Sequence, residues 1–397
     1  MVDSQITSVV TSCRSRFWIF EQARELQRLG MLKLLIADYP KSWPARYGVP
    51  AEKVQSLLFA GFVNHGLGNI LNYLPARQRD RATRLIHDNF SRQLAKLIPG
   101  GTQFFIGLSS FCWEALEECK LRGIPCAVDH ASLHMADEKS LIAEESSHWG
   151  LPTPSDVCPD WVIEKEQREY SLADYIFVPS SAAKDSLIRH GVSGQKIFIN
   201  SYGVDISAFR PTGASQEVFR VIQAGTVCMR KGVLTTLSAF TRARLPNAEL
   251  LILGGGIEVS GMKQIILKMS SSNVVLRPAV PFSRLNEVYN TCSVMVLASV
   301  SDGFALVVIH AMACGIPVII TDNVGAKDLI RDGENGFIVP VGSPELIAER
   351  LKLLHNDPDF RRNMGLSARE TVKAGFGWED YGNRLGNFLR SNVQGEK

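Results

Sequence analysis

Short apolar runs rich in β-branched residues alternate with longer amphipathic segments along the first half of the chain. The apolar runs have the length of strands and lie at Ile6–Val10, Leu32–Ala37, Gln103–Leu108, Cys126–Asp129, Tyr175–Val178 and Lys196–Asn200. The segments between them favour helices, among them Phe17–Leu29, Asp80–Leu97, Trp113–Arg122 and Ser181–His190. Such alternation predicts a parallel sheet covered by helices on both faces. The segment Tyr39–Ala76 is rich in loop-forming residues and yields no regular element.

The same alternation begins again after a polar break at Ser207–Gln216, which contains Pro211 and Gly213 and predicts a linker. Strands are expected at Phe219–Gln223, Glu249–Leu253, Val274–Arg277, Val294–Ala298 and Pro317–Thr321. Helices are expected at Gly232–Arg244, Gly261–Lys268, Arg284–Asn290, Ala305–Cys314, Pro344–Leu354 and Asp359–Ala374. The pattern therefore predicts an α/β protein with two doubly wound, Rossmann-like domains that face a cleft. Ligands of such sheets bind beyond the carboxyl ends of the strands.

The composition favours a compact protein in a reducing compartment. The 397 residues are 45% hydrophobic and 21% charged, and the net charge of +3 is too small to argue for nucleic-acid binding. The eight cysteines form no CxxC pair and no zinc spacing with histidine, which is typical of reduced thiols. The N-terminus lacks the pattern of a signal peptide, and His310, Gly315 and Pro317 interrupt the longest apolar stretch, Val307–Ile320. We therefore expect a soluble, cytoplasmic protein.

The segment Ser301–Ile320 carries the strongest chemical signal in the chain. A buried strand is expected to end at Ala298, and a turn with Asp302 and Gly303 leads into the helix Ala305–Cys314. The free N–H groups at the start of this helix, together with the helix dipole, form a site for an anion. Because it has no side chain, Gly303 would let an anionic ligand approach the backbone.

This segment resembles the signature of glycosyltransferase family 4, also called group 1, of the GT-B fold. Other matching pieces follow in the family's order: Glu169-Tyr170, Ala173-Asp174-Tyr175, Val178-Pro179-Ser180, Tyr202-Gly203-Val204-Asp205, Phe209-Arg210-Pro211, Gly225, Arg230-Lys231-Gly232 and Asn335 to Pro340. Several motifs in the right order are more specific than any one alone. The resemblance implies an acceptor-side domain over residues 1–205 and a nucleotide-sugar donor domain over residues 206–375. It also implies that a final helix, in residues 376–397, crosses back to the first domain.

The resemblance also implies an activity. We expect a retaining hexosyltransferase that moves a sugar from a nucleoside-diphosphate sugar to a glycan or lipid-linked acceptor, in polysaccharide biosynthesis. The nucleotide sugar is then a co-substrate, and neither a cofactor nor a metal ion is expected, because protein cations would stabilise the diphosphate. Two alternatives stay open: a degenerate relative that binds nucleotide sugars without transfer, and a GT-B epimerase or phosphorylase.

The resemblance gives a role to each matched position of the second domain. Asp302 is expected to contact hydroxyls of the donor sugar. The backbone of the next residues is expected to face the sugar and the diphosphate at Phe304, Ala305 and Leu306. Lys231 matches the lysine that holds the diphosphate in the family, and it is expected to act as a catalytic residue together with Asp302.

Two positions of this donor site depart from the family's pattern. Thr226 stands where an arginine usually follows the glycine, here Gly225, and Arg230 is expected to compensate. His310 stands where a second acid holds the ribose. A neutral imidazole offers one donor and one acceptor, so we expect weaker ribose binding than a carboxylate gives. With an ordinary histidine pKa of about 6.5, His310 would also make donor binding depend on pH.

The first domain offers a histidine at the end of a strand. His130 follows the strand Cys126–Asp129, where a doubly wound sheet places reactive groups. Family members carry a functional histidine after the matching strand, so His130 is the third expected catalytic residue and would orient the donor sugar. His134 lies in the same loop and competes for this role. The loop after the first strand is assigned to the acceptor, through Arg14, Arg16 and Phe17.

The segment Arg77–Lys96 carries six Lys and Arg residues against only Asp80 and Asp88. Such a segment is usually the solvated face of a helix. The alternative is peripheral attachment to anionic lipid at the inner face of a membrane, where each cation contributes about 1 kcal/mol.

Overall fold

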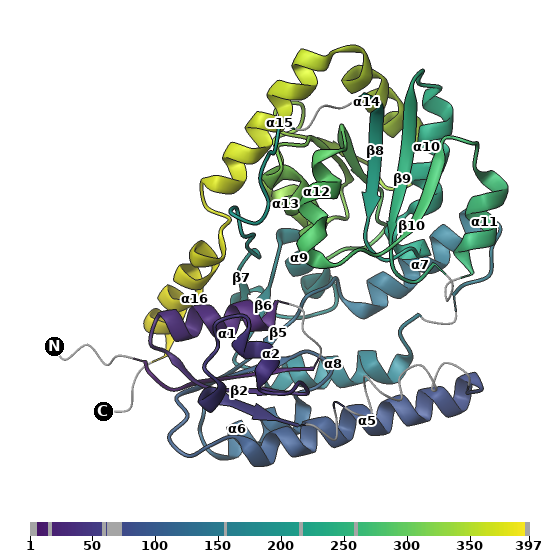
Figure 1. Ribbon diagram of the computed structural model, residues 1–397. Coiled ribbons are helices and arrows are strands. Elements are labelled where there is room, and N and C mark those ends of the chain that lie inside the picture. Colours follow the sequence, from purple (N-terminus) through teal and green to yellow (C-terminus); the bar gives the residue numbers. More distant parts are fainter. Residues whose placement is uncertain are drawn as a thin grey trace.

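Two parallel β-sheets, each with helices packed on it, form the two lobes of the computed structural model (Figure 1). The structure describes residues 6–14, 18–57, 61, 74–154, 157–213, 217–257 and 261–393. Within these residues the first sheet has seven strands in the order β3-β2-β1-β4-β5-β6-β7, and the second has six in the order β10-β9-β8-β11-β12-β13. All the pairings between neighbouring strands are parallel. The predicted pair of doubly wound α/β domains is confirmed.

The first sheet consists largely of short runs that are buried on both faces, as parallel strands require. Its strands are β1 (Val9–Cys13), β2 (Leu32–Ala37), β3 (Val54–Ser56), β4 (Phe104–Leu108), β5 (Cys126–Asp129), β6 (Tyr175–Val178) and β7 (Ile197–Ile199). Its helices are α1 (Ile19–Arg28), α2 (Ser42–Ala45), α5 (Ala76–Leu97), α6 (Trp113–Leu121), α7 (Met135–His148), α8 (Asp160–Leu172) and α9 (Ser181–Arg189).

The second sheet follows the same plan in the second half of the chain. Its strands are β8 (Phe219–Ala224), β9 (Ala248–Gly254), β10 (Val274–Pro278), β11 (Val294–Leu297), β12 (Val318–Thr321) and β13 (Phe337–Val339). The helices are α10 (Val233–Ala243), α11 (Met262–Met269), α12 (Leu285–Asn290), α13 (Leu306–Ala313), α14 (Pro344–Asn356), α15 (Pro358–Lys373) and α16 (Trp378–Asn392).

The first strand begins and ends three residues later than the hydrophobic pattern predicts, at Val9–Cys13 in place of Ile6–Val10. It continues through the polar Thr11 and Ser12, both of which are buried. The hydroxyl of Thr11 donates to Oε1 of Gln22 in α1, at 2.7 Å. Because this partner satisfies the hydroxyl, a polar residue stays in a buried strand where hydrophobicity alone predicts an end.

Helix α7 is not predicted from periodicity, because its sequence is polar on most sides. The structure gives the reason, since α7 packs against the second lobe as well as the first (Figure 1). Glu145 of α7 is buried, and its Oε1 accepts a hydrogen bond from Thr235 of α10 at 3.0 Å. A helix between two lobes buries polar groups against polar partners, so no apolar stripe marks it.

The chain passes between the lobes twice, and the two crossings are bonded to each other. Val204 in the first crossing donates its N–H to the carbonyl oxygen of Phe376 in the second, at 2.9 Å. A Cβ added to Gly203 would lie 2.6 Å from the backbone nitrogen of Trp378. A cavity of about 700 Å³ lies beside the crossings, and Arg24, Asp205 and Trp378 are among the residues that line it.

Helix α16 follows the second crossing and lies against α1 of the first lobe (Figure 1). Two glycines one turn apart allow the close approach of these helices. A Cβ added to Gly382 would lie 2.6 Å from Cβ of Glu25, and one added to Gly386 would lie 2.7 Å from a methyl carbon of Leu29. The packing of α16 on α1 thereby holds the C-terminal end of the chain against the first lobe.

Replacing Gly382 with leucine should push α16 away from α1. Overpacking of this kind costs about 1–3 kcal/mol of the free energy of unfolding, measured by urea denaturation. The matched control is Asn387→Leu, an exposed position of the same helix, which should stay within about 0.5 kcal/mol of the parent chain. Equal losses in both variants would contradict the packing of α16 through Gly382.

Candidate functional site

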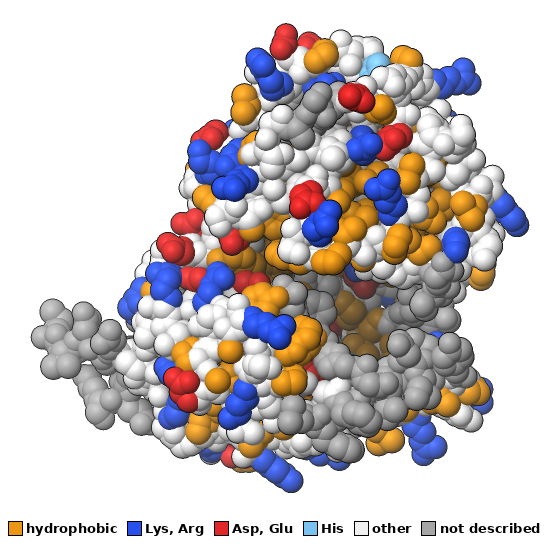
Figure 2. Space-filling view, in the orientation of Figure 1, with side chains coloured by type: hydrophobic (Ala, Val, Ile, Leu, Met, Phe, Trp, Pro, Cys, Tyr) orange, Lys and Arg blue, Asp and Glu red, His pale blue; other side chains and the backbone are white. Residues whose placement is uncertain are grey.

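The carboxyl ends of the two sheets face each other, and Figure 2 shows that the molecule is hollowed between the lobes. The loop after β5 and the loop after β11 meet there from opposite sides. A Cβ added to Gly303 would overlap the carbonyl oxygen of Ala131 and lie 2.7 Å from Cα of Ser132. The hydroxyl of Ser180 donates to the carbonyl oxygen of Gly303 at 2.7 Å. Gly303 thus allows the backbone of the first lobe to approach, where the sequence analysis expected a ligand.

Lys231 and Asp302 form a largely buried ion pair beside this contact. Nζ of Lys231 donates to Oδ2 of Asp302, and the two side chains are only 12% and 10% exposed. Lys231 ends a 3₁₀ turn, η4 (Met229–Lys231), and is followed by Gly232 with a φ of +59°, which favours glycine. Burial alone would raise the pKa of Asp302, but the charges of Lys231 and Arg230 outweigh it and lower the pKa. Asp302 is therefore a carboxylate at neutral pH.

The backbone after Asp302 has an unusual conformation. Ala305 lies at the N-cap of α13 with a φ of +69°, in the left-handed region that residues other than glycine rarely adopt. The N–H of Phe304 donates to Oδ1 of Asp302 at 3.4 Å. The N–H of Val308 donates to the carbonyl oxygen of Ala305 at 2.9 Å, whereas the N–H groups of Leu306 and Val307 precede the first acceptor of the helix. Strain at a charged helix start is typical of functional sites.

Arg230 connects this site to the first lobe through Glu138 of α7. Nη1 of Arg230 donates to the carbonyl oxygen of Ser301 at 3.0 Å, and its Nε lies 3.9 Å from Oε1 of Glu138. The hydroxyl of Ser301 donates to the second oxygen of Glu138 at 3.1 Å. Glu138 could not be identified from the sequence, because nothing in a polar helix marks the residue that reaches another domain. Each of the two predicted diphosphate ligands, Arg230 and Lys231, thus lies beside a carboxylate.

Gly225 and Thr226 lie at the carboxyl end of β8, on the same edge of the sheet as Lys231. Gly225 has a φ of +127° and donates its N–H to the carbonyl oxygen of Leu253 at 3.0 Å. Thr226 is exposed in the turn that follows. Its short side chain adds no charge to this turn, and the cations Arg230 and Lys231 follow a few residues later.

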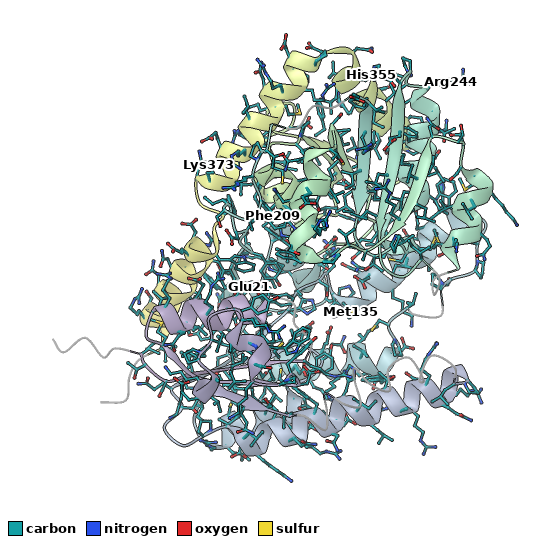
Figure 3. The ribbon with its side chains drawn as sticks, in the orientation of Figure 1. Glu21, Met135, Phe209, Arg244, His355 and Lys373 are labelled. Atoms are coloured by element: carbon teal, nitrogen blue, oxygen red, sulfur yellow. The ribbon has the colours of Figure 1, made fainter. Side chains whose placement is uncertain are left out.

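His310 packs its ring among aromatic side chains. The ring stacks on Phe209 with centroids 4.1 Å apart and planes 7° apart, and it meets the edge of Phe282 at 5.7 Å. Figure 3 places Phe209 in the part of the upper lobe that faces Glu21 of the lower lobe. Nδ1 of His310 is buried and has no hydrogen-bond partner among the described residues.

Burial lowers the pKa of His310 to about 3. The expectation that rested on an ordinary histidine pKa is therefore wrong: this ring is neutral from pH 5 upward.

His130 is fully buried at the end of β5. Its Nε2 lies 3.2 Å from the carbonyl oxygen of Leu133, and its Nδ1 lies 3.1 Å from the hydroxyl of Tyr170 and 3.3 Å from that of Ser109. Burial lowers the pKa of His130 to about 4, so the ring is neutral at pH 7. Nε2–H then donates to Leu133, and Nδ1 accepts from a hydroxyl. Both ring nitrogens are engaged within the first lobe.

A buried pair of glutamates stands behind His130. Tyr170 lies between them and the ring, with its hydroxyl 3.0 Å from Oε2 of Glu166. Glu169 accepts hydrogen bonds from the N–H groups of Ser110 and Cys112, at 2.6 and 2.9 Å, at the start of α6. Burial raises the pKa of Glu166 to about 7 and that of Glu169 to about 8. The Glu169-Tyr170 motif of the sequence therefore supports the loop that surrounds His130.

His134, the competing histidine, caps the start of α7. Its Nδ1 accepts the N–H of Ala136 at 3.2 Å, and its ring stacks on His190 at 3.9 Å. Burial, with the neighbouring histidines, lowers its pKa to about 4. These contacts give His134 a structural role at the helix start.

Arg14 is the one member of the predicted acceptor loop that the structure describes, since Arg16 and Phe17 lie outside the described residues. It is buried at the end of β1, and its guanidinium lies 4.7 Å from the ring centre of Phe111. His87 packs on the same ring at 4.2 Å. Burial lowers the pKa of Arg14 to about 10, so the side chain keeps its charge at neutral pH.

Comparison with known proteins relates this geometry to a family. Residues 206–371 match the family model described as glycosyl transferases group 1. Over this range the second lobe is similar to group 1 glycosyltransferase domains. The match is at the level of group 1, and family 4 stays a prediction.

A curated relative and two solved structures extend the comparison. Over 281 residues the chain is 30% identical to D-inositol 3-phosphate glycosyltransferase of Paenarthrobacter aurescens, and the alignment covers 66% of each protein. Sucrose-phosphate synthase from Thermosynechococcus elongatus superposes with a TM-score of 0.73 at 19% identity, covering 97% of this chain and 98% of that one. The Anabaena protein HepE in complex with UDP-glucose gives 0.68 at 15% identity, covering 96% and 99%.

The superposed structures confirm the GT-B fold over both lobes. The alignments to the first three curated relatives span 66%, 68% and 64% of those proteins' lengths. In the described part of this glycosyltransferase-like chain, no group of three His, Cys, Asp or Glu side chains is arranged to hold a metal ion. None of the described helices has the length and apolar content needed to cross a bilayer.

Replacing Lys231 with methionine should leave the carboxylate of Asp302 buried without its main partner. Breaking a buried pair in this way costs about 3 kcal/mol of the free energy of unfolding at pH 7. In the parent chain the folded pKa of Asp302 is lowered, so its contribution is present above the unfolded pKa of about 3.9 and is lost as the pH falls toward the folded value. The difference between variant and parent should therefore shrink below about pH 4.

Urea denaturation at several pH values measures this difference. The double variant Lys231→Met with Asp302→Asn should be more stable at pH 7 than Lys231→Met alone, because it buries no unpaired charge. A loss that stays the same from pH 7 to pH 3.5 would contradict the role of the ionised pair.

Proposed function

We propose that the chain is a retaining glycosyltransferase that moves a hexosyl group from a nucleoside-diphosphate sugar to a glycan or lipid-linked acceptor, in the biosynthesis of polysaccharides. The observation that carries this proposal is the buried Lys231–Asp302 pair, with Arg230 beside it, at the start of α13. The D-inositol 3-phosphate glycosyltransferase relative supports the reaction class, and the UDP-glucose complex of HepE supports the donor class.

The main chemical task of such a transfer is to stabilise the departing diphosphate. Lys231, Arg230 and the first N–H groups of α13 supply fixed positive charge and dipoles where the negative charge develops. As the donor enters, Lys231 exchanges its bond to Asp302 for one to the diphosphate. The freed carboxylate of Asp302 then accepts hydrogen bonds from hydroxyls of the sugar. Since protein cations do this work, the transfer is proposed to need no metal ion and no cofactor.

The groups of the first lobe are proposed to orient the reactants. His130 is proposed to orient the donor sugar. Its Nε2–H, which donates to the carbonyl oxygen of Leu133 in this structure, would donate to a sugar hydroxyl instead. Arg14 lies at the carboxyl end of β1 and is proposed to face the acceptor. On the donor side, His310 is proposed to bind the ribose through its neutral ring. Contact between the loops of Gly303 and Ala131 would exclude water from the reacting atoms.

A thermal-shift series with nucleotides and nucleotide sugars tests this proposal. A ligand at 100 times its dissociation constant adds roughly 2.7 kcal/mol to the free energy of unfolding. One nucleoside diphosphate and its sugar conjugate should raise the unfolding midpoint, and NMR of the product should show a retained anomeric configuration. Stabilisation without any turnover would indicate a binding protein. Turnover that needs free phosphate would indicate a phosphorylase, and turnover without an acceptor would indicate an epimerase.

Replacing Lys231 with alanine should reduce the turnover number for the donor by about 100- to 1000-fold. The reason is that loss of one preorganised contact to the developing charge costs about 3–4 kcal/mol in the transition state. Steady-state kinetics with the donor found by thermal shift measures the effect. Lys352→Ala, an exposed lysine of α14, is the control and should match the parent chain. Near-normal turnover in Lys231→Ala would contradict the assignment of Lys231 to the diphosphate.

We also propose that the protein acts in the cytoplasm, in peripheral contact with an anionic membrane through α5. The aspartates of this helix face α8: Asp80 accepts from the indole of Trp161 at 2.6 Å, and Asp88 pairs with Lys165 at 3.1 Å. The exposed side of α5 thus keeps its positive charge and adds one apolar side chain, Leu85, that is 64% exposed. The exposed cations of α5 are Arg77, Arg81, Arg84, Arg92 and Lys96.

Vesicles that contain an anionic lipid should bind the protein at low salt and release it as salt screens the charges beyond about 8 Å. Replacing Arg77, Arg81 and Arg84 with glutamine should weaken co-sedimentation, since each cation contributes about 1 kcal/mol. The matched control replaces three exposed cations of the second lobe with glutamine, at Lys352, Arg362 and Lys373. Equal binding by both triple variants would leave α5 as an ordinary solvated face.

A further inference from the structure

The ring of His310 has only one nitrogen left for a ligand. Its Nδ1 is enclosed and has no partner among the described residues, and the residue as a whole is 8% exposed. One face is covered by the ring of Phe209, which lies parallel to it at 4.1 Å. A donor that reaches this ring can therefore form one hydrogen bond, through Nε2, as donor or acceptor according to the tautomer.

One hydrogen bond is too few for both hydroxyls of a ribose. A carboxylate could accept from the 2′- and the 3′-hydroxyl at once, and hydrogen bonds to a charged group are the stronger kind. A neutral imidazole with one free nitrogen serves one hydroxyl and gives the other no hydrogen bond. Loss of the unserved hydroxyl then costs the complex little affinity.

The aromatic neighbours of His310 add to this effect. Phe282 approaches the same ring edge-on at 5.7 Å, and 47% of Phe282 is exposed at the rim that follows β10. A hydroxyl placed against these rings would give up water without gaining a partner, whereas a methylene group packs there without that loss. The surroundings of His310 therefore suit a sugar ring with one hydroxyl fewer.

On the basis of the proposed function, we propose that the donor site does not require the 2′-hydroxyl of the ribose. It accepts 2′-deoxynucleoside diphosphate sugars as readily as their ribose counterparts. The donor class thereby widens to deoxythymidine-type nucleotide sugars, and His310 is the residue that determines this specificity.

Calorimetric titration of the full chain with matched nucleotide pairs tests the proposal. The probes are UDP against 2′-deoxy-UDP, ADP against 2′-deoxy-ADP, and GDP against 2′-deoxy-GDP, at pH 7. For the pair that binds, the two dissociation constants should agree within about threefold. If the parent chain binds the ribose form with a dissociation constant at least tenfold lower than that of the deoxy form, a difference of about 1.4 kcal/mol, this result by itself would overturn the proposal.

Variants of His310 locate the effect. His310→Glu should restore discrimination, with the ribose form bound at least about tenfold more tightly than the deoxy form. His310→Gln keeps a neutral side chain and should resemble the parent chain. An unchanged ratio in a folded His310→Glu variant would overturn the role of His310.

Lys231→Ala is the matched control for this ratio. It should weaken both members of a pair by the same factor, because both carry the same diphosphate. A failure of the proposed function looks different from a failure of this inference. If none of the six nucleotides binds, the donor site itself is wrong. If nucleotides bind with a strong preference for the ribose form, the donor site is supported and only the proposed tolerance of deoxyribose is contradicted.

Discussion

The buried ion pair between Lys231 and Asp302 constrains the structure around it, because neither charge could stay alone between two lobes. Asp302 needs a cation within reach, and the turn at Gly232 brings Lys231 to it. Gly303, which follows Asp302 in the chain, must lack a side chain so that the backbone of Ala131 can pack against it. Helix α7 then adds Glu138, which balances the charge of Arg230. A charged centre of this kind is costly to build, and a protein keeps it where charge is needed.

The charges of the site are distributed unequally between the lobes. In the second lobe Asp302 is held ionised next to Lys231 and Arg230. In the first lobe burial lowers the pKa of His130 to about 4 and raises that of Glu169 to about 8, whereas Arg14 keeps its charge. One wall of the cleft therefore offers fixed charge, and the other offers mainly neutral hydrogen-bonding groups. A reaction in which only the leaving group gains charge fits such a division.

The sequence predicts the parts of this arrangement that depend on local pattern. Alternating apolar runs predict both sheets, and the turn, glycine and helix start around Asp302 can be read from adjacent residues. Glu138 could not be predicted, because its partners Ser301 and Arg230 are more than 90 residues away and its own helix is polar. The neutral state of the His310 ring could not be predicted from the sequence either, for a similar reason. It depends on the rings of Phe209 and Phe282, which only the tertiary fold places beside it.

The hydrogen bond between the two crossings has a further consequence. Since Val204 and Phe376 are joined, both connections between the lobes form one narrow strap. The cavity of about 700 Å³ beside this strap is lined from both crossings, from α1 and from α16, so any turning of the lobes must change its volume. Water then enters or leaves with each movement. Osmolytes, which are excluded from protein surfaces, would shift the balance toward whichever arrangement holds less of that water.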